Sequence, residues 1–155
     1  MENFVVSARK YRPTDFKHVV GQGHITTTLK NAIKNDHLAQ AFLFCGPRGV
    51  GKTTCARILA KTINCENRQE NGEACNNCSS CEAFKSNSSF NVHELDAASN
   101  NSVDEIRNLV DQVRYLPQKG KYKVYIIDEV HMLSASAFNA FLKTLEEPPK
   151  HDIFI

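Results

Sequence analysis

Residues 46–53 read GPRGVGKT, and they are the most informative stretch of the chain for its fold. It matches the pattern G-x-x-x-x-G-K-[ST], in which glycines let the backbone curl until consecutive N–H groups point at phosphate oxygens. The apolar run 41–45 precedes it, and 53–64 follows with apolar residues at helical spacing. A strand, a glycine-rich loop and a helix in this order predict a nucleoside triphosphate site. The predicted contacts are Gly46, Pro47, Arg48, Gly49, Val50, Gly51, Lys52, Thr53 and Thr54.

A second apolar run, 124–127, ends at Asp128 and Glu129 in the pattern called Walker B. Lys52 is expected to neutralise the β and γ phosphates, and Thr53 to ligate Mg²⁺ through its hydroxyl. Asp128 is expected to act on Mg²⁺ as well, while Glu129 orients and polarises the attacking water. Lys52, Asp128 and Glu129 are therefore the predicted catalytic residues of an ATPase.

Short apolar runs alternate with helical patterns along the rest of the chain. The predicted strands are 41–45, 92–96, 124–127 and one starting at Asp152, and the predicted helices are 24–35, 53–64 and two that begin at Ser102 and Ser134. Ser102 and Glu105 have the spacing of a capping box. We predict one α/β domain with a parallel sheet flanked by helices. His131 is expected to cap a turn, with nucleotide sensing as the alternative.

The bulk composition fits a single globular domain. The chain has 155 residues, of which 41% are hydrophobic and 23% charged, and a formal net charge of +2. Residues 1–61 hold ten Lys/Arg against three acids, a positive field that suits phosphate and could also touch nucleic acid. No apolar run approaches the roughly 18 to 20 residues of a membrane span, and residues 1–10 have no signal-peptide core. The sequence therefore predicts a cytoplasmic protein with no membrane partner.

Six cysteines in such a chain favour metal binding over disulfides, because the cytosol keeps thiols reduced. Three of them have the spacing C-x2-C-x2-C, and a fourth lies at the end of the predicted helix 53–64. They predict one tetrahedral zinc site, formed by Cys65, Cys75, Cys78 and Cys81. An exchanging dithiol, an iron–sulfur cluster and free thiols are the alternatives.

The cysteines lie in a segment of about 65–89 that is poor in apolar residues, so a bound metal would replace the missing core of this insertion. Cys45 and Cys55 lie in the predicted strand and helix around the glycine-rich loop. We expect both to be small core residues.

Several motifs together make the chain resemble the γ/τ subunits of bacterial DNA polymerase III clamp loaders, which are AAA+ ATPases. The resemblance covers essentially the whole chain. The motifs are Tyr11-Arg12-Pro13, Phe16, 19–22, 46–53, 64–66, the cysteine triplet, 96–99, 128–133 and 142–149.

The resemblance implies that an N-terminal arm packs near the adenine base; plain N-terminal packing is the alternative. The implied residues are Ala8, Arg9, Tyr11, Arg12, Val19 and Val20. It further implies that the full-length protein works in a ring with other clamp-loader subunits. There ATP binding opens the sliding clamp, and hydrolysis releases it on primed DNA.

The sequence stops at Ile155, before the sensor threonine, arginine-finger motif, helical lid and collar of that family. We therefore expect residues 1–155 to form a partial AAA+ nucleotide-binding domain that binds ATP, Mg²⁺ and Zn²⁺ and hydrolyses ATP poorly alone. One rival is a zinc-dependent nucleic-acid-binding or interaction module. Another is a P-loop ATPase outside the clamp-loader group.

Overall fold

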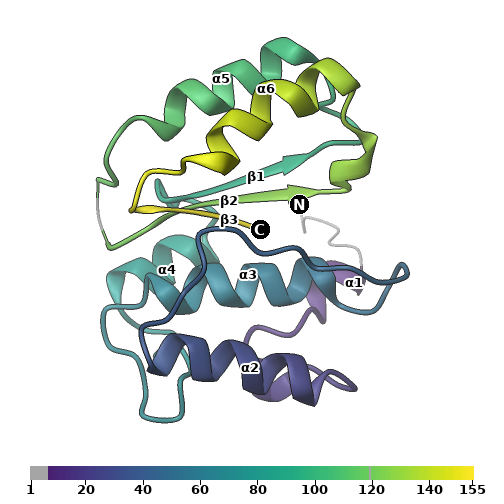
Figure 1. The fold of residues 1–155 in the computed structure, drawn as a ribbon. Coiled ribbons are helices and arrows are strands. Elements are labelled where there is room, and N and C mark those ends of the chain that lie inside the picture. The colour runs from purple at the N-terminus through teal and green to yellow at the C-terminus, as the bar shows by residue number, and fades with distance from the viewer. Residues whose placement is uncertain (1–6, 119) are drawn as a thin grey trace, which may run out of the picture.

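The computed structural model describes residues 7–118 and 120–155, with the backbone only for Ala8 and Arg9. Three parallel strands form one sheet in the order β1-β2-β3 (Figure 1). The strands are β1 (Val92–Asp96), β2 (Lys123–Asp128) and β3 (Asp152–Phe154). The helices are α1 (Ser7–Lys10), α2 (Gly23–Lys34), α3 (Lys52–Ile63), α4 (Ser79–Lys85), α5 (Val103–Val113) and α6 (Ala135–Glu146), with 3-10 turns η1 (Phe16–His18) and η2 (Val130–Met132).

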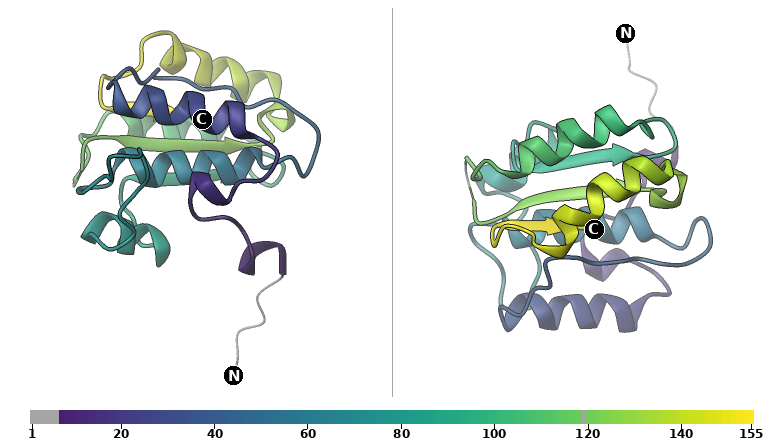
Figure 2. Two further views of the ribbon diagram at one scale, coloured as in Figure 1. Left: turned by 90° about the horizontal axis from the view of Figure 1, so that it is seen from below. Right: turned by 45° about the horizontal axis from the view of Figure 1, so that its top comes forward.

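Helices cover both faces of the sheet. Figures 1 and 2 show α5 and α6 on one face, and α3 with α2 behind it on the other. Alternate residues of β2 serve the two layers, as the two-residue period of a strand requires. Val124 and Ile126 pack in the α2–α3 core, whereas Tyr125 and Ile127 pack in the α5–α6 core. Full burial of such a side chain stabilises the fold by about 1.5–3 kcal/mol, which explains the continuous apolar run.

The predicted helix starts at Ser102 and Ser134 and the predicted capping box at Ser102 are confirmed. The Ser102 hydroxyl accepts a hydrogen bond from the Glu105 N–H, and the Glu105 carboxylate accepts one from the Ser102 N–H. The Ser134 hydroxyl accepts a bond from the Ala137 N–H at 3.2 Å. Both helices therefore start at the residues where side chains satisfy free N–H groups.

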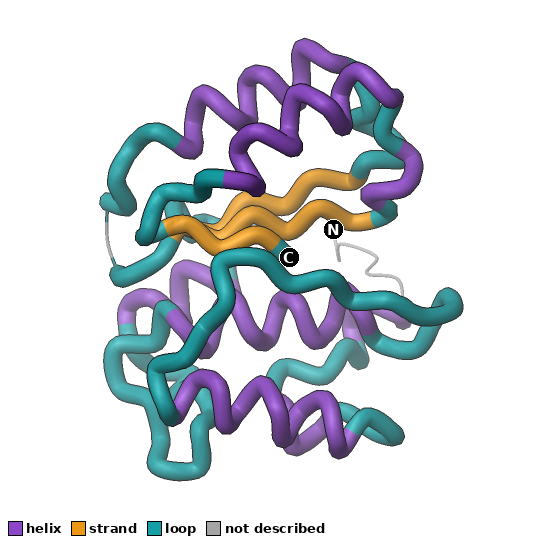
Figure 3. The backbone as a smooth tube through the Cα atoms, in the orientation of Figure 1, coloured by secondary structure: helices purple, strands orange, loops and turns teal. Residues whose placement is uncertain are grey.

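The predicted strand 41–45 is wrong in extent. Only Ala41 forms a bridge, to Phe154, and the following residues run as a loop along the sheet edge (Figure 3). The physical reason is that its neighbour β3 has only three residues, so the ladder ends after the bond from the Phe42 N–H to the Phe154 carbonyl, 2.8 Å long. Cys45 is consequently exposed, not a core residue, whereas Cys55 is buried as expected.

The segment 65–89 contains a helix, α4, that its composition did not predict. Its buried residue is Cys81, which packs with the other cysteines of the segment instead of joining an apolar stripe. Among the residues that the structure describes, no helix is long and apolar enough to cross a membrane.

Candidate functional site

The glycine-rich loop enters α3 through left-handed backbone. Gly49 and Gly51 have φ values of 85° and 97°, and Gly51 is the N-cap of α3. A side chain would strain the chain at both positions, so the loop needs glycine there. The first helical bond runs from the Cys55 N–H to the Gly51 carbonyl, which leaves the N–H groups of residues 52–54 at the positive end of the helix. The loop is therefore built to face an anion.

Lys52 and Thr53 lie at this helix start with different partners. The Lys52 ammonium donates to the carbonyls of Gly46 and Pro47 at 2.7 and 3.0 Å. The Thr53 hydroxyl donates to Asp128 Oδ2 at 2.7 Å, and Asp128 is the last residue of β2. The structure thus brings together the two residues that the sequence assigned to one magnesium ion.

Glu129 adopts a left-handed conformation with φ of 53°, which is costly for a residue with a side chain and is typical of functional sites. Its N–H donates to Asp128 Oδ1 at 3.0 Å, and its carboxylate lies 3.4 Å from His131 Nε2. Both side chains are exposed. Sequence reasoning missed this pairing, for which the close spacing of the two residues was the only signal.

A cleft of about 1060 Å³ lies beside the loop. Its lining residues include Lys52, Thr53, Asp128 and Glu129, together with Phe138 of α6. The predicted catalytic residues therefore share one cavity.

Asp96 lines the same cleft and was absent from the predicted site. It lies at the end of β1 and pairs with Asp128 in the register of the sheet. Its carboxylate accepts bonds from the Ala98 N–H and the Ser99 hydroxyl at 3.0 and 3.1 Å. The end of a neighbouring parallel strand was the signal that could have found it.

The predicted adenine-binding residues whose side chains the structure describes, Tyr11, Arg12, Val19 and Val20, do not line this cleft. Tyr11 and Val20 are 75% and 92% exposed, Val19 packs against the α2–α3 core, and Arg12 is half-buried. The side chains of Ala8 and Arg9 lie outside the described residues. The contact of this arm with an adenine base stays a prediction.

The four predicted metal ligands converge at the far end of α3. The sulfurs of Cys65, Cys75, Cys78 and Cys81 all lie within 4.8 Å of one another. Cys65 Sγ is 3.5 Å from Cys75 Sγ and 3.9 Å from Cys78 Sγ. Tetrahedral zinc with bonds of about 2.3 Å places its sulfurs about 3.8 Å apart, so this donor set fits zinc.

Backbone N–H groups point at these sulfurs. The Cys75 N–H donates to Cys65 Sγ, and the Cys78 N–H donates to Cys75 Sγ, each at 3.3 Å. Burial raises the pKa of Cys65 and of Cys81. Burial also acts to raise the pKa of Cys78, yet hydrogen bonds from the backbone at Glu66 and Cys81 and from neighbouring thiols lower it to about 6. The lowered pKa of Cys78 favours the thiolate, which is the form that binds metal.

The fold and the site define an α/β protein with a glycine-rich loop at one end of its core helix and a four-cysteine cluster at the other. A family model described as "DNA polymerase III, delta subunit" matches residues 21–155. The chain belongs to this family.

The similar curated proteins are subunits of the same polymerase. The chain is 56% identical over 147 residues to "DNA polymerase III subunit tau" of Bacillus subtilis, which covers 95% of this chain and 26% of that protein. It is 48% identical to "DNA polymerase III subunit tau" of Escherichia coli, over 99% of this chain and 24% of that protein. The chain thus spans about a quarter of the length of these relatives.

A solved structure is also similar, the DNA polymerase III gamma subunit-related protein of Thermotoga maritima. It is 28% identical, with a TM-score of 0.39 over 48% of this chain and 26% of that one.

Proposed function

We propose that this chain is the ATP-binding part of a clamp-loader motor subunit, with an AAA+ core. One observation carries the proposal: the bond between Thr53 and Asp128, two residues 75 positions apart. A hydroxyl at a helix start and a carboxylate at a strand end, both facing one cleft, are the protein groups that Mg²⁺ with a nucleoside triphosphate uses. The family membership and the tau relatives support the same proposal.

Each residue of the loop has a defined task in this proposal. The N–H groups of residues 49–54 surround the phosphates, and Lys52 exchanges its carbonyl partners for phosphate oxygens. Thr53 and Asp128 hold Mg²⁺ directly or through its waters. Glu129 orients the attacking water, and the arm, including Tyr11 and Val20, covers the adenine base. The bound ion supplies charge neutralisation at the phosphates.

The four-cysteine cluster binds zinc and serves the fold of the insertion in this proposal. The buried cluster within the insertion consists of its cysteines and Ala74, whereas Phe84 packs against the α2–α3 core. Metal binding supplies the free energy that a core would supply elsewhere. In the full-length protein, the motor acts in the cytoplasm with other clamp-loader subunits, the sliding clamp and primed DNA.

The proposal is tested by titrating the purified chain with ATP, with and without Mg²⁺, in calorimetry. We expect binding that Mg²⁺ strengthens and that Lys52→Ala weakens by about tenfold or more, because a charged phosphate contact is lost. Lys150→Ala, an exposed lysine outside the cleft, is the matched control. Unchanged ATP affinity in Lys52→Ala would refute the nucleotide site.

A second titration, with DNA at moderate salt, separates this proposal from the rival zinc-dependent nucleic-acid module. DNA binding by the wild type without any ATP binding would favour the rival.

A further inference from the structure

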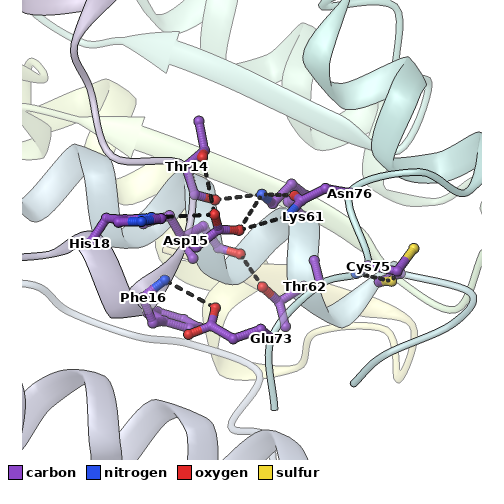
Figure 4. A network of polar contacts seen from close by, with 12 residues as sticks. Thr14, Asp15, Phe16, His18, Lys61, Thr62, Glu73, Cys75 and Asn76 are labelled. Carbon is purple, nitrogen blue, oxygen red and sulfur yellow. Dashed lines mark hydrogen bonds and ion pairs between the residues drawn. The ribbon is translucent and has the colours of Figure 1, made fainter. Parts of the chain in front are cut away.

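Glu73, a buried acid of the insertion, holds the arm by its backbone. Its carboxylate accepts a bond from the Phe16 N–H at 3.1 Å (Figure 4). It also accepts one from the Lys17 N–H at 3.0 Å. The same carboxylate pairs with Lys30 of α2 at 2.9 Å. Glu73 is only 3% exposed. Because both acceptor oxygens are committed to the arm or to α2, the path of residues 14–18 depends on where the insertion places this side chain.

Asn76 makes a second connection from inside the metal cluster. It lies between Cys75 and Cys78 and has a left-handed backbone with φ of 62°. Its amide donates to Asp15 Oδ1 at 2.9 Å and accepts from the Lys61 ammonium (Figure 4). The turn that brings two cysteines to one ion therefore also carries a side chain to the arm.

Lys61 completes the network from α3. Its ammonium donates to the Thr14 carbonyl and lies 3.3 Å from Asp15 Oδ1. Asp15 and Lys61 are each 7% exposed. Buried charges need their partners in place, and charge-assisted bonds are directional, so this network fixes the course of the arm as well as attaching it.

The arm leaves apolar side chains free on either side of this anchored segment. Phe16 is buried in the α2–α3 core, whereas Tyr11 and Val20 are exposed on the two flanks. Exposed aromatic and aliphatic side chains at fixed positions can cover a planar base, and they cannot do so if the segment between them moves.

We propose that Glu73 and Asn76 are positioning residues for the nucleotide site, through which the metal-binding insertion places the arm against the base. The inference rests on the proposed function, because it assigns the arm to the base end of a bound nucleotide. A metal ion in the cysteine cluster orders the turn that carries Asn76, and loss of the ion releases the arm. The phosphate end, held by the loop, stays unchanged.

The test combines amide hydrogen exchange with two affinities. Zinc-loaded wild type, Glu73→Gln and Asn76→Gly are compared in exchange of residues 11–20 and in affinity for ATP and for inorganic tripolyphosphate, both with Mg²⁺. Glycine tolerates the left-handed backbone at position 76, so Asn76→Gly removes the side chain and keeps the turn. Glu70→Gln and Asn77→Gly change exposed neighbours in the same insertion and are the matched controls.

We expect both variants to keep zinc by elemental analysis, to exchange the Phe16 and Lys17 amides roughly tenfold faster, and to bind ATP about 3–10-fold more weakly with unchanged tripolyphosphate affinity. Removal of zinc from the wild type by a chelator should likewise give faster exchange in the arm and weaker ATP binding, with unchanged tripolyphosphate affinity. Unchanged exchange in the arm overturns the inference, and so does an equal loss for both ligands or an unchanged ATP affinity. Wild type that binds neither ligand defeats the proposed function itself, before any variant is compared.

Discussion

Charged side chains are exposed at one end of the parallel strands and buried at the other. We call these two ends the carboxyl edge and the amino edge of the sheet. At the carboxyl edge, Asp128 is half-buried and Glu129 exposed, and both face the cleft. At the amino edge, Lys123 is 6% exposed and Asp152 is fully buried. The Lys123 ammonium donates to the Gln112 and Tyr115 carbonyls. An exposed carboxylate can exchange its hydrogen bond to a hydroxyl for a contact with a metal ion or water. Buried charged groups stay with the partners that the fold provides.

Helix α3 connects these edges. The glycine-rich loop lies at its first residue, and Cys65 follows shortly after its last. Asn64, next to Cys65, accepts a bond from the N–H of Tyr122, immediately before β2, at 3.0 Å. We therefore expect changes at the carboxyl edge to alter ligand binding, and changes at the amino edge and in the insertion to alter stability and metal content.

The largest expected effect is at the insertion. Cys78→Ser should lower zinc affinity by about a hundredfold or more, because it replaces a thiolate ligand with a hydroxyl. Competition with a chromophoric chelator and elemental analysis measure this loss. Cys45→Ser, an exposed cysteine outside the cluster, should keep zinc. Tripolyphosphate affinity should persist in both variants, and unchanged zinc in Cys78→Ser would contradict a four-sulfur site.

At the carboxyl edge, Asp128→Asn should remove most of the strengthening that Mg²⁺ gives to ATP binding, a change of about 10–100-fold. The amide still accepts the Thr53 bond but has no charge for the ion. Unfolding free energy should change by less than about 1 kcal/mol, since the side chain is only half-buried. Calorimetry with and without Mg²⁺ and urea unfolding measure the two effects. Asp111→Asn changes an exposed acid on α5 and is the control. If Asp128→Asn lost as much unfolding free energy as Mg²⁺-dependent binding free energy, the proposed difference between the two edges would be wrong.

Sequence reasoning was accurate where the signal is local. The capping box at Ser102 and the strand 92–96 depend on residues close together in the chain, and both are confirmed. The proximity of Thr53 and Asp128 was predictable because each residue belongs to a recognisable motif. Thr53 ends the glycine-rich loop motif, and Asp128 follows the apolar run of the Walker B pattern. The length of the predicted strand 41–45 was not predictable, because it depends on how many residues of β3 can pair with it.

The arm–insertion network had no signal in the sequence. Glu73 and Asp15 are 58 positions apart and look like ordinary surface acids in a polar segment. Their burial follows from how η1 packs between α3 and the insertion, which only the tertiary structure shows. The burial of Asp152 was likewise not predictable from the sequence, because it depends on tertiary packing. A charged residue at the start of a strand commonly lies in solvent.

Asp152 offers a test of the amino edge by pH. Burial raises its pKa to about 6, although His151 and Lys123 act to lower it. A raised pKa means that the folded state binds the proton more tightly than the unfolded chain, so this contribution to stability is present below about pH 4 and is lost as pH rises through about 6. Asp152→Asn should therefore be more stable than the wild type by about 1–3 kcal/mol at pH 8.

Urea unfolding of both proteins at pH 5 and pH 8 measures the difference. The stability gap between variant and wild type should widen from pH 5 to pH 8, while ATP affinity stays the same. Two further titratable groups lie near this edge: burial raises the pKa of Tyr125. Burial and the nearby Lys123 lower the pKa of His93, which favours its neutral form. A variant less stable than the wild type at pH 8 would show that Asp152 is needed as the charged partner of Lys123.

The smallest effect comes from Ser102, which follows β1 on the carboxyl side of the sheet and is exposed. Ser102→Ala removes the N-cap acceptor for the Glu105 N–H and should lower the unfolding free energy by about 1 kcal/mol. Ser102→Asp keeps an acceptor and should keep the stability. ATP affinity should be unchanged in both variants, because the residue caps α5 and does not line the cleft. A measurable loss of ATP affinity in Ser102→Ala would mean that α5 is part of the nucleotide site.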